Sequence, residues 1–217
     1  MQYLMLRQMK YKTTTKLFKG IYQYKVVLVC SGAQFFRSGD MTSTLEQLSQ
    51  IDLEKNNKTF PNWRQSLVKT QDDLDYALKL QHVLSKQTDI DIRVESPWIT
   101  VYTNNKKHID SIIKINKDHV KYVSAPTTTL EQNTIIMPKM DFDYRVTLGK
   151  TTQEHSSFVE WAETNPKLKV TKSAKTDLLK PRSWGGKHFY ITGENNLLLA
   201  KMHLGSSIAK IERIVKE

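Results

Sequence analysis

The sequence has almost no cysteine. Cys30 is the only one among 217 residues, so the chain contains neither an intrachain disulfide nor a metal site built from several thiolates. A chain of this length with 39% hydrophobic residues can bury one sizeable core, or two small ones, without such cross-links. We therefore expect it to fold unaided and to work in a reducing compartment.

Long hydrophobic runs are also missing. The longest is Val26–Cys30, which is far shorter than the roughly 20 residues that a membrane-spanning helix needs. The N-terminal residues 1–12 are interrupted by Gln2, Arg7 and Gln8 and lead to no small-residue cleavage site, unlike a signal peptide. The sequence therefore predicts no membrane contact and a cytoplasmic localisation.

The signatures of several enzyme classes are absent. There is no phosphate-binding Walker A loop and no dinucleotide-binding glycine pattern, and the six histidines lack the paired spacing of a zinc site. His155 stands beside Ser156 and Ser157, but no Gly-x-Ser-x-Gly elbow surrounds either serine. We expect no cofactor, and these absences favour a non-enzymatic function.

Basic residues are abundant and unevenly distributed. The formal net charge is +11 and the isoelectric point is near 9.6, which favours an acidic partner. Residues 1–39 hold seven Lys or Arg and no acid, with aromatic residues between them. Residues 167–187 hold seven more, with Asp177 as the one acid. Such mixtures of cations and rings are typical of surfaces that bind nucleic acid.

The first half of the chain alternates between strand and helix patterns. Residues 11–30 predict a β-hairpin that turns at Lys19-Gly20, and a second hairpin turns at Ser96-Pro97. Ser43, with Glu46 three residues later, predicts the start of a short helix, and residues 70–87 give the strongest helix pattern. We assign Trp63, Trp98 and Trp161 to the hydrophobic core.

The second half begins after a seam at residues 125–138, which contains two prolines and a threonine run. Residues 144–148 predict a strand, and Thr151 with Glu154 predicts the cap of the next helix. Residues 187–204 predict a hairpin, and the last residues predict a helix capped by Ser206 or Ser207. No internal repeat is evident. The fold class we expect is α+β, in one domain of residues 1–217 with antiparallel hairpins alternating with helices and two lobes meeting at the seam.

Two groups of residues are candidates for binding nucleic acid. In the first, tyrosines with lysines around them predict a stacking platform on the first hairpin: Tyr11, Tyr22 and Tyr24 with Lys12, Lys16 and Lys25. In the second, cations and Trp184 surround Gly185-Gly186: Lys172, Lys175, Arg182 and Lys187. The alternatives are tyrosines packed on a half-buried sheet and a buried tryptophan beside a tight turn. We expect single-stranded DNA or RNA as the partner.

Two other functions remain open. A metal-dependent nuclease would use acids spaced along predicted strands, namely Asp89, Asp91 and Glu95 or the pair Asp141 and Asp143. A solvated strand face produces the same acidic spacing. A virion or assembly component would use the basic ends of the chain to hold an acidic protein partner or a packaged genome.

Two segments of the second half carry a family resemblance. Residues 144–152 (YRVTLGKTT) and residues 182–190 (RSWGGKHFY) are similar to uncharacterised proteins of tailed marine bacteriophages. The resemblance implies expression in a bacterial cytoplasm during infection. It implies no catalytic residue.

Overall fold

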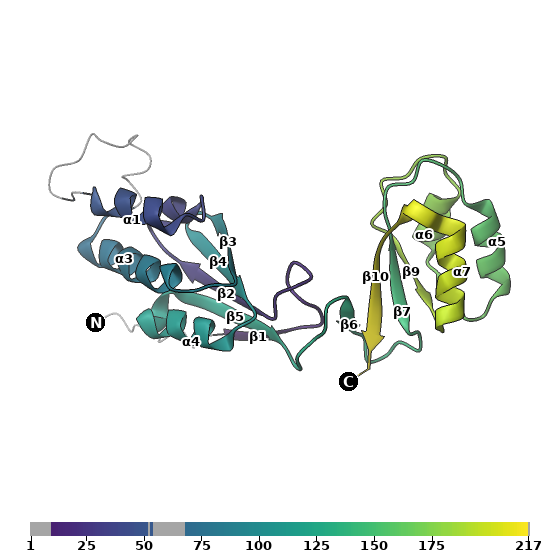
Figure 1. Cartoon of the computed structure of the whole chain (residues 1–217), viewed down its shortest axis with the longest axis horizontal. Coiled ribbons are helices and arrows are strands. Elements are labelled where there is room, and N and C mark those ends of the chain that lie inside the picture. The colour runs from purple at the N-terminus through teal and green to yellow at the C-terminus, as the bar shows by residue number, and fades with distance from the viewer. Residues whose placement is uncertain (1–9, 52, 54–67, 217) are drawn as a thin grey trace, which may run out of the picture. The chain divides into compact units, whose positions relative to one another are not determined.

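The chain divides into two compact units. The computed structural model describes residues 10–51, 53 and 68–216. The units are Met1–Thr129 and Leu130–Glu217, so the division falls within the seam at residues 125–138. Each unit has a five-stranded sheet and its own helices (Figure 1), which confirms the α+β class. None of the helices in the described residues is long and apolar enough to cross a membrane.

The first unit builds its sheet in the order β1-β5-β2-β4-β3. β1 is parallel to β5, and the other neighbours are antiparallel. Its elements are β1 (Lys10–Thr14), β2 (Tyr24–Val29), the 3-10 helix η1 (Ala33–Phe36), α1 (Met41–Ser49), α3 (Gln71–Ser85), β3 (Ile90–Glu95), β4 (Trp98–Thr103), α4 (Lys106–Ile115), η2 (Lys117–His119) and β5 (Val120–Pro126).

The first predicted hairpin is wrong as a strand pairing, although its turn exists. Phe18 bridges to Tyr22 across Lys19 and Gly20, both of which have positive φ. The segments on either side of this turn do not pair as strands, because β5 lies between β1 and β2. Burial accounts for this order, because β1 is exposed along most of its length whereas β2 buries Val26 to Leu28 and therefore takes an interior position. The hairpin that turns at Ser96-Pro97 is confirmed as β3–β4.

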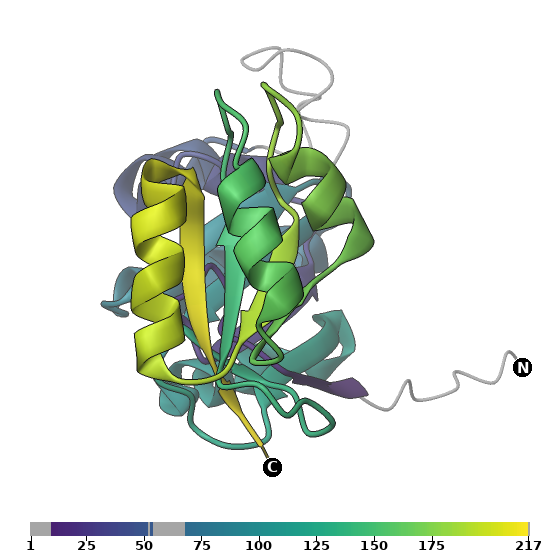
Figure 2. The same ribbon diagram turned by 90° about the vertical axis from the view of Figure 1, so that its right-hand side faces the viewer.

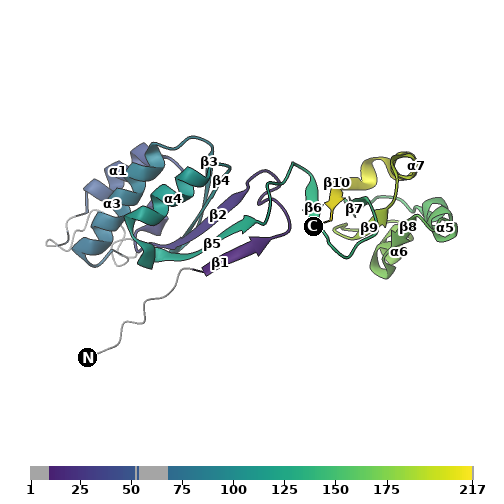
Figure 3. The same ribbon diagram turned by 90° about the horizontal axis from the view of Figure 1, so that it is seen from below.

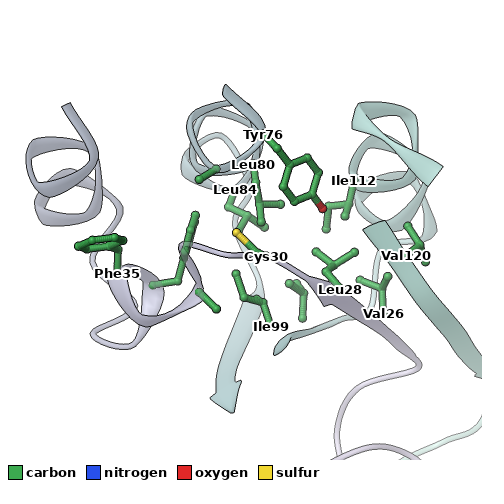
Figure 4. Close-up of a cluster of buried hydrophobic side chains, with 14 of the residues drawn as sticks. Val26, Leu28, Cys30, Phe35, Tyr76, Leu80, Leu84, Ile99, Ile112 and Val120 are labelled. Atoms are coloured by element: carbon green, nitrogen blue, oxygen red, sulfur yellow. The ribbon is translucent and has the colours of Figure 1, made fainter. Parts of the chain in front are cut away.

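The helices of the first unit lie on one face of the sheet (Figures 1 and 3). Figure 4 shows the Cys30 side chain among Leu80, Leu84 and Ile99, which come from α3 and β4. The strongest helix prediction is confirmed, since α3 begins after Thr70, whose Oγ1 accepts a hydrogen bond from the Asp73 amide.

The predicted start of the first helix is wrong. α1 begins after Asp40, whose carboxylate accepts hydrogen bonds from the amides of Thr42 and Ser43. Ser43 therefore lies inside the first turn and does not cap it. An ionised carboxylate satisfies two amides at once and also interacts favourably with the helix dipole, which makes Asp40 the better cap.

The second unit builds its sheet in the order β6-β10-β7-β9-β8. β6 is parallel to β10, and the other neighbours are antiparallel. Three helices cover one face of this sheet (Figure 2). Its elements are β6 (Thr134–Ile136), β7 (Tyr144–Leu148), α5 (Ser156–Thr164), β8 (Leu168–Val170), α6 (Lys172–Leu178), β9 (His188–Ile191), α7 (Glu194–Leu204), the 3-10 helix η3 (Gly205–Ser207) and β10 (Ile208–Val215).

Two predictions at the C-terminal end are reversed in the structure. Residues 197–204 belong to helix α7 and not to a strand, because Leu197, Ala200 and Leu204 recur at helical spacing and face the core. The last element is strand β10 and not a helix. Its register shifts between Ile208 and Lys210, so an irregularity places Ile208 and Ile211 against the same core, as helical spacing would.

The predicted cap at Thr151 is also wrong. α5 begins after His155, and Thr151 instead pairs with Ser183 in an isolated bridge between two loops. The bridge gives the Thr151 amide and carbonyl a backbone partner in Ser183. Thr151 therefore connects two loops and does not begin a helix.

The two units have the same sheet topology, which the sequence does not reveal. In each, the fifth strand lies between the first and second, parallel to the first, and the third strand is at the far edge. Two of their links differ. The link between the second and third strands contains η1, α1 and α3 in the first unit and α5 in the second, and the link between the third and fourth strands is a tight turn in the first unit and contains α6 in the second. The chain is therefore a tandem pair of similarly connected modules.

Candidate nucleic-acid interface

The first sheet has a face rich in lysine and aromatic side chains, opposite the helices α1, α3 and α4. Because side chains alternate along a strand, Val26 and Leu28 face the helices whereas Lys25 faces the other way. Lys12 and Tyr122 lie on the same side as Lys25. We call this the lysine–aromatic face, and its members are Lys12, Phe18, Lys19, Lys25, Trp98, Tyr102, Lys121 and Tyr122.

Two lysines from different strands meet at one tyrosine ring. The Nζ atom of Lys12 on β1 lies 4.0 Å from the ring centre of Tyr122 on β5. The Nζ atom of Lys25 on β2 lies 5.1 Å from the same ring and 5.0 Å from that of Phe18. All three distances are within the range of cation–π attraction. The sheet order produces this meeting, since β5 lies between β1 and β2.

The turn at Lys19-Gly20 packs onto the same face. The rings of Phe18 and Tyr22 each lie 6.1 Å from the ring of Tyr102 on β4. Lys19 places its Nζ 4.8 Å from the Tyr102 ring centre and 2.7 Å from a carboxylate oxygen of Asp91. Burial, followed by the charges of Asp91 and Asp89, raises the pKa of Tyr22, so this phenol stays neutral.

Trp98 extends the face toward the other end of β4. Its side chain is 39% exposed, and the Nζ atom of Lys121 lies 3.1 Å from the ring centre. The assignment of Trp98 to the core is therefore wrong. Trp161 packs partly buried against the second core, and Trp63 lies outside the described residues.

The predicted residues of the first group separate in the structure. Lys12 and Lys25 come together at Tyr122, and Tyr22 supports Tyr102 from a buried position. Tyr24 packs on the helix side of the sheet, so it cannot join a platform with Tyr22. Tyr11 and Lys16 are both exposed.

Sequence reasoning missed three rings of the lysine–aromatic face, namely Trp98, Tyr102 and Tyr122. The alternation of β4 contains the missing signal, since Ile99 and Val101 face the core and Trp98, Thr100 and Tyr102 face away. The position of the Tyr122 ring could not be predicted, because it depends on β5 lying between β1 and β2, and no local sequence pattern indicates that order.

In the second unit, Trp184 is displayed on the surface. Its side chain is 90% exposed, and the Nζ atom of Lys150 lies 5.5 Å from the ring centre. We call residues 180–187 the Trp184 loop. It contains the exposed cations Arg182 and Lys187 and is held by the bridge between Thr151 and Ser183. A tryptophan this exposed contributes little to the core and is available for contact with a ligand.

The other two predicted cations lie on α6, before the loop. Lys175 forms an ion pair with Glu163 on α5, which offsets its charge locally. Lys172 is exposed at the first position of the helix. The exposed cations of this unit closest to Trp184 along the chain are therefore Arg182 and Lys187.

Four of the five acids considered for a nuclease, all except Asp89, have other partners. Asp91 pairs with Lys19, and Glu95 pairs with Arg93 on the same strand. Asp143 accepts a hydrogen bond from the Gly193 amide at 2.8 Å, and Asp141 pairs with Lys216. Within residues 10–51, 53 and 68–216, no group of three or more His, Cys, Asp or Glu side chains is placed to hold a metal ion.

The second sheet carries a buried carboxylate on the face without helices. Glu212 is 1% exposed and accepts hydrogen bonds from Arg145 Nε at 2.9 Å and Lys210 Nζ at 2.8 Å. Burial alone would raise the pKa of Glu212, but the hydrogen bonds and charges of Lys210 and Arg145 lower it below the ordinary value. The carboxylate is therefore ionised and neutralises part of the positive charge on this face.

Comparison with known proteins finds no relative of this chain. No family model, curated protein or solved structure matches the chain.

Proposed function

We propose that the protein binds single-stranded DNA or RNA without cleaving it, through the lysine–aromatic face of its first unit. The observation that carries this proposal is the meeting of Lys12 and Lys25 at Tyr122, with Lys19 at Tyr102 and Lys121 at Trp98. Four lysines from separate segments are thus held against rings of one sheet face.

The chemistry of this arrangement suits an unpaired strand. An ammonium group that lies on a ring keeps N–H groups free to contact phosphate oxygens, and the chain of phosphates supplies several negative charges at once. Bases of a single strand have free faces that stack on exposed rings such as Trp98. Stacked and paired bases in a duplex do not offer those faces, so we expect a preference for single strands.

The Trp184 loop supports a second contact in the other unit. Its tryptophan is more exposed than any ring of the lysine–aromatic face, and it stands beside Lys150 in space and between Arg182 and Lys187 in sequence. We propose that it stacks on one base while the cations contact adjoining phosphates. The proposed setting is a reducing bacterial cytoplasm, which the phage resemblance of this loop implies.

The experiment is fluorescence-anisotropy binding to labelled single-stranded DNA, single-stranded RNA and duplex across a salt series. Mg²⁺ is included, and the probes are examined afterwards on a denaturing gel. We expect tighter binding to single strands, a steep decline of affinity with salt, and intact probes. A cleaved probe would instead favour the nuclease, and no binding near physiological salt would favour an acidic protein partner.

A matched pair of variants locates the interface. Lys12→Gln with Lys25→Gln removes two charges from the lysine–aromatic face, and Lys106→Gln with Lys107→Gln removes two exposed charges from α4 on the opposite side of the sheet. The first variant should reduce the slope of log affinity against log salt by about 0.7 for each lysine that contacts a phosphate. The second should change the slope little. Equal effects of both would mean that charge alone, and not this face, governs binding.

A further inference from the structure

Helix α7 presents an apolar surface on its outward side. Leu197, Ala200 and Leu204 face the core of the second unit. On the other side, Leu198 is 59% exposed, Leu199 42% and Met202 73%. These three residues are spaced one, three and four positions apart, so they form one continuous stripe along the helix. We call them the α7 stripe.

The first unit shows that the module does not require such a stripe. α4 occupies the same place in its module, between the fourth and fifth strands. It buries Ile109, Ile112 and Ile113, but its outward positions are polar and exposed: Lys106, Lys107, Asp110, Ser111 and Lys114. Because α4 packs on its sheet with a polar outer side, packing of this helix on the sheet does not require an apolar stripe. Grouped exposed apolar side chains are typical of a contact surface.

The charges beside the stripe indicate what covers it. Glu194 and Lys201 are seven residues apart, which is about two helical turns, so both lie along the same flank of α7. Glu194 stands in the first turn, Lys201 stands in the last, and neither belongs to an ion pair among the residues that the structure describes. The Tyr144 hydroxyl donates to Glu194 Oε1 across 3.5 Å, which is a long hydrogen bond.

A second copy of α7 in antiparallel orientation fits both features. Reversing the helix direction places Glu194 of each copy beside Lys201 of the other, so two ion pairs form around one twofold axis. The same operation brings Leu198 and Leu199 of one copy against the same residues of the other, places Met202 of each copy over the first turn of the other helix, and aligns the helix dipoles favourably. The surface is thus complementary to itself in apolar character and in charge.

We propose that the protein forms a twofold symmetric dimer through antiparallel contact of its α7 helices. Three apolar side chains from each copy make a small interface, so the dimer forms reversibly as the protein concentration rises. The proposal is independent of nucleic-acid binding and is tested without nucleic acid.

The first measurement is sedimentation velocity of the full chain over a concentration series from about 1 μM to about 500 μM, the range in which small interfaces associate. We expect the weight-average mass to rise from 25.2 kDa toward twice that value. Leu198→Glu with Met202→Glu should keep the chain monomeric. The matched control is Leu45→Glu, an exposed leucine of α1 in the other unit, which should leave the dimer unchanged. A constant monomer mass, or a dimer that survives the double stripe substitution, overturns the proposal.

Charge reversal tests the antiparallel arrangement itself. Glu194→Lys places two lysines on the flank, and Lys201→Glu places two acids there, so each variant alone should dimerise at least about 5-fold more weakly. An equimolar mixture of the two variants should dimerise as well as the unchanged chain, because every flank pair is then attractive. Circular dichroism of each variant shows whether α7 is retained. Variants that weaken the dimer alone but fail to associate when mixed would overturn the antiparallel pairing.

Discussion

The backbone of Gly185 lies directly against the carbonyl group of Gly149. A Cβ atom at residue 185 would be 2.3 Å from the carbonyl oxygen and 2.4 Å from the carbonyl carbon of Gly149. Both contacts are with backbone, which has no side-chain freedom to move away. The adjoining Gly186 donates its amide hydrogen to the Leu148 carbonyl at 2.8 Å, so the Trp184 loop is fastened to the end of β7 at this point.

Gly185→Ala should therefore destabilise the second unit strongly. Gly185 and Gly186 both have positive φ, which costs alanine about 1 kcal/mol at either position. Only at Gly185 does the new methyl group meet backbone, so we expect a loss of about 3 kcal/mol or more there and about 1 kcal/mol for Gly186→Ala. Calorimetric unfolding of the two variants measures the difference. Equal losses would show that the loop shifts freely to accept a Cβ.

Trp184→Ala should weaken binding without changing stability. The ring is 90% exposed, so its removal costs the folded state almost nothing. If it stacks on a base, affinity for a single strand should fall by about 1–3 kcal/mol while the salt slope stays the same, since no charge is lost. The check combines anisotropy titrations at two salt concentrations with thermal unfolding. An unchanged affinity would remove the Trp184 loop from the interface.

Cys30 should be unreactive in the native protein. Its side chain is fully buried, and burial raises the pKa of the thiol to about 12, so the reactive thiolate is scarce near neutral pH. We expect a maleimide to label the native chain at least about 100-fold more slowly than the denatured chain. Cys30→Ala with Val29→Cys provides the comparison, because Val29 comes directly before Cys30, is the last residue of β2 and is exposed. Rapid labelling of Cys30 would show that the first core opens readily.

Acid should weaken the second unit through Glu212. Its pKa is lowered in the folded state, so its stabilisation is present above the ordinary carboxyl pKa of 4.5 and is lost as the pH falls through the folded-state value. Glu212→Gln should cost about 2–3 kcal/mol at pH 7, because Arg145 and Lys210 lose a charged acceptor. It should also flatten the decline of stability below pH 5. Denaturant unfolding at several pH values measures both effects, and a parallel decline in both proteins would contradict the assignment.

Local patterns in the sequence predict elements whose signals are local. The α3 helix, the β3–β4 hairpin and the strand at residues 144–148 each depend on spacing within one segment, and all three are confirmed. Capping was harder to predict, because Asp40 competes with Ser43 and only the folded backbone shows which amides need a partner.

Patterns that depend on distant partners misled the sequence reasoning. β10 imitates a helix because its irregularity brings Ile208 and Ile211 to the same side, and that irregularity follows from its pairing with β7. β1 pairs with residues more than 100 positions away, so the hairpin that its neighbours suggest does not form. The lysine–aromatic face has the same origin, since Tyr122 reaches Lys12 and Lys25 through that pairing. The sequence grouped Lys12 with Lys25, and both lie at the ring of Tyr122, a residue that the predicted group did not contain.

The position of the fifth strand in each module has a consequence for a growing polypeptide. β5 separates β1 from β2, and β10 separates β6 from β7, yet each is made last in its module. During translation, neither sheet is complete until its final strand has left the ribosome. β1 therefore has no strand partner while about a hundred further residues are added. A chain interrupted before β10 would likewise leave β6 and β7 without their shared neighbour. Completion of each module therefore depends on its C-terminal end.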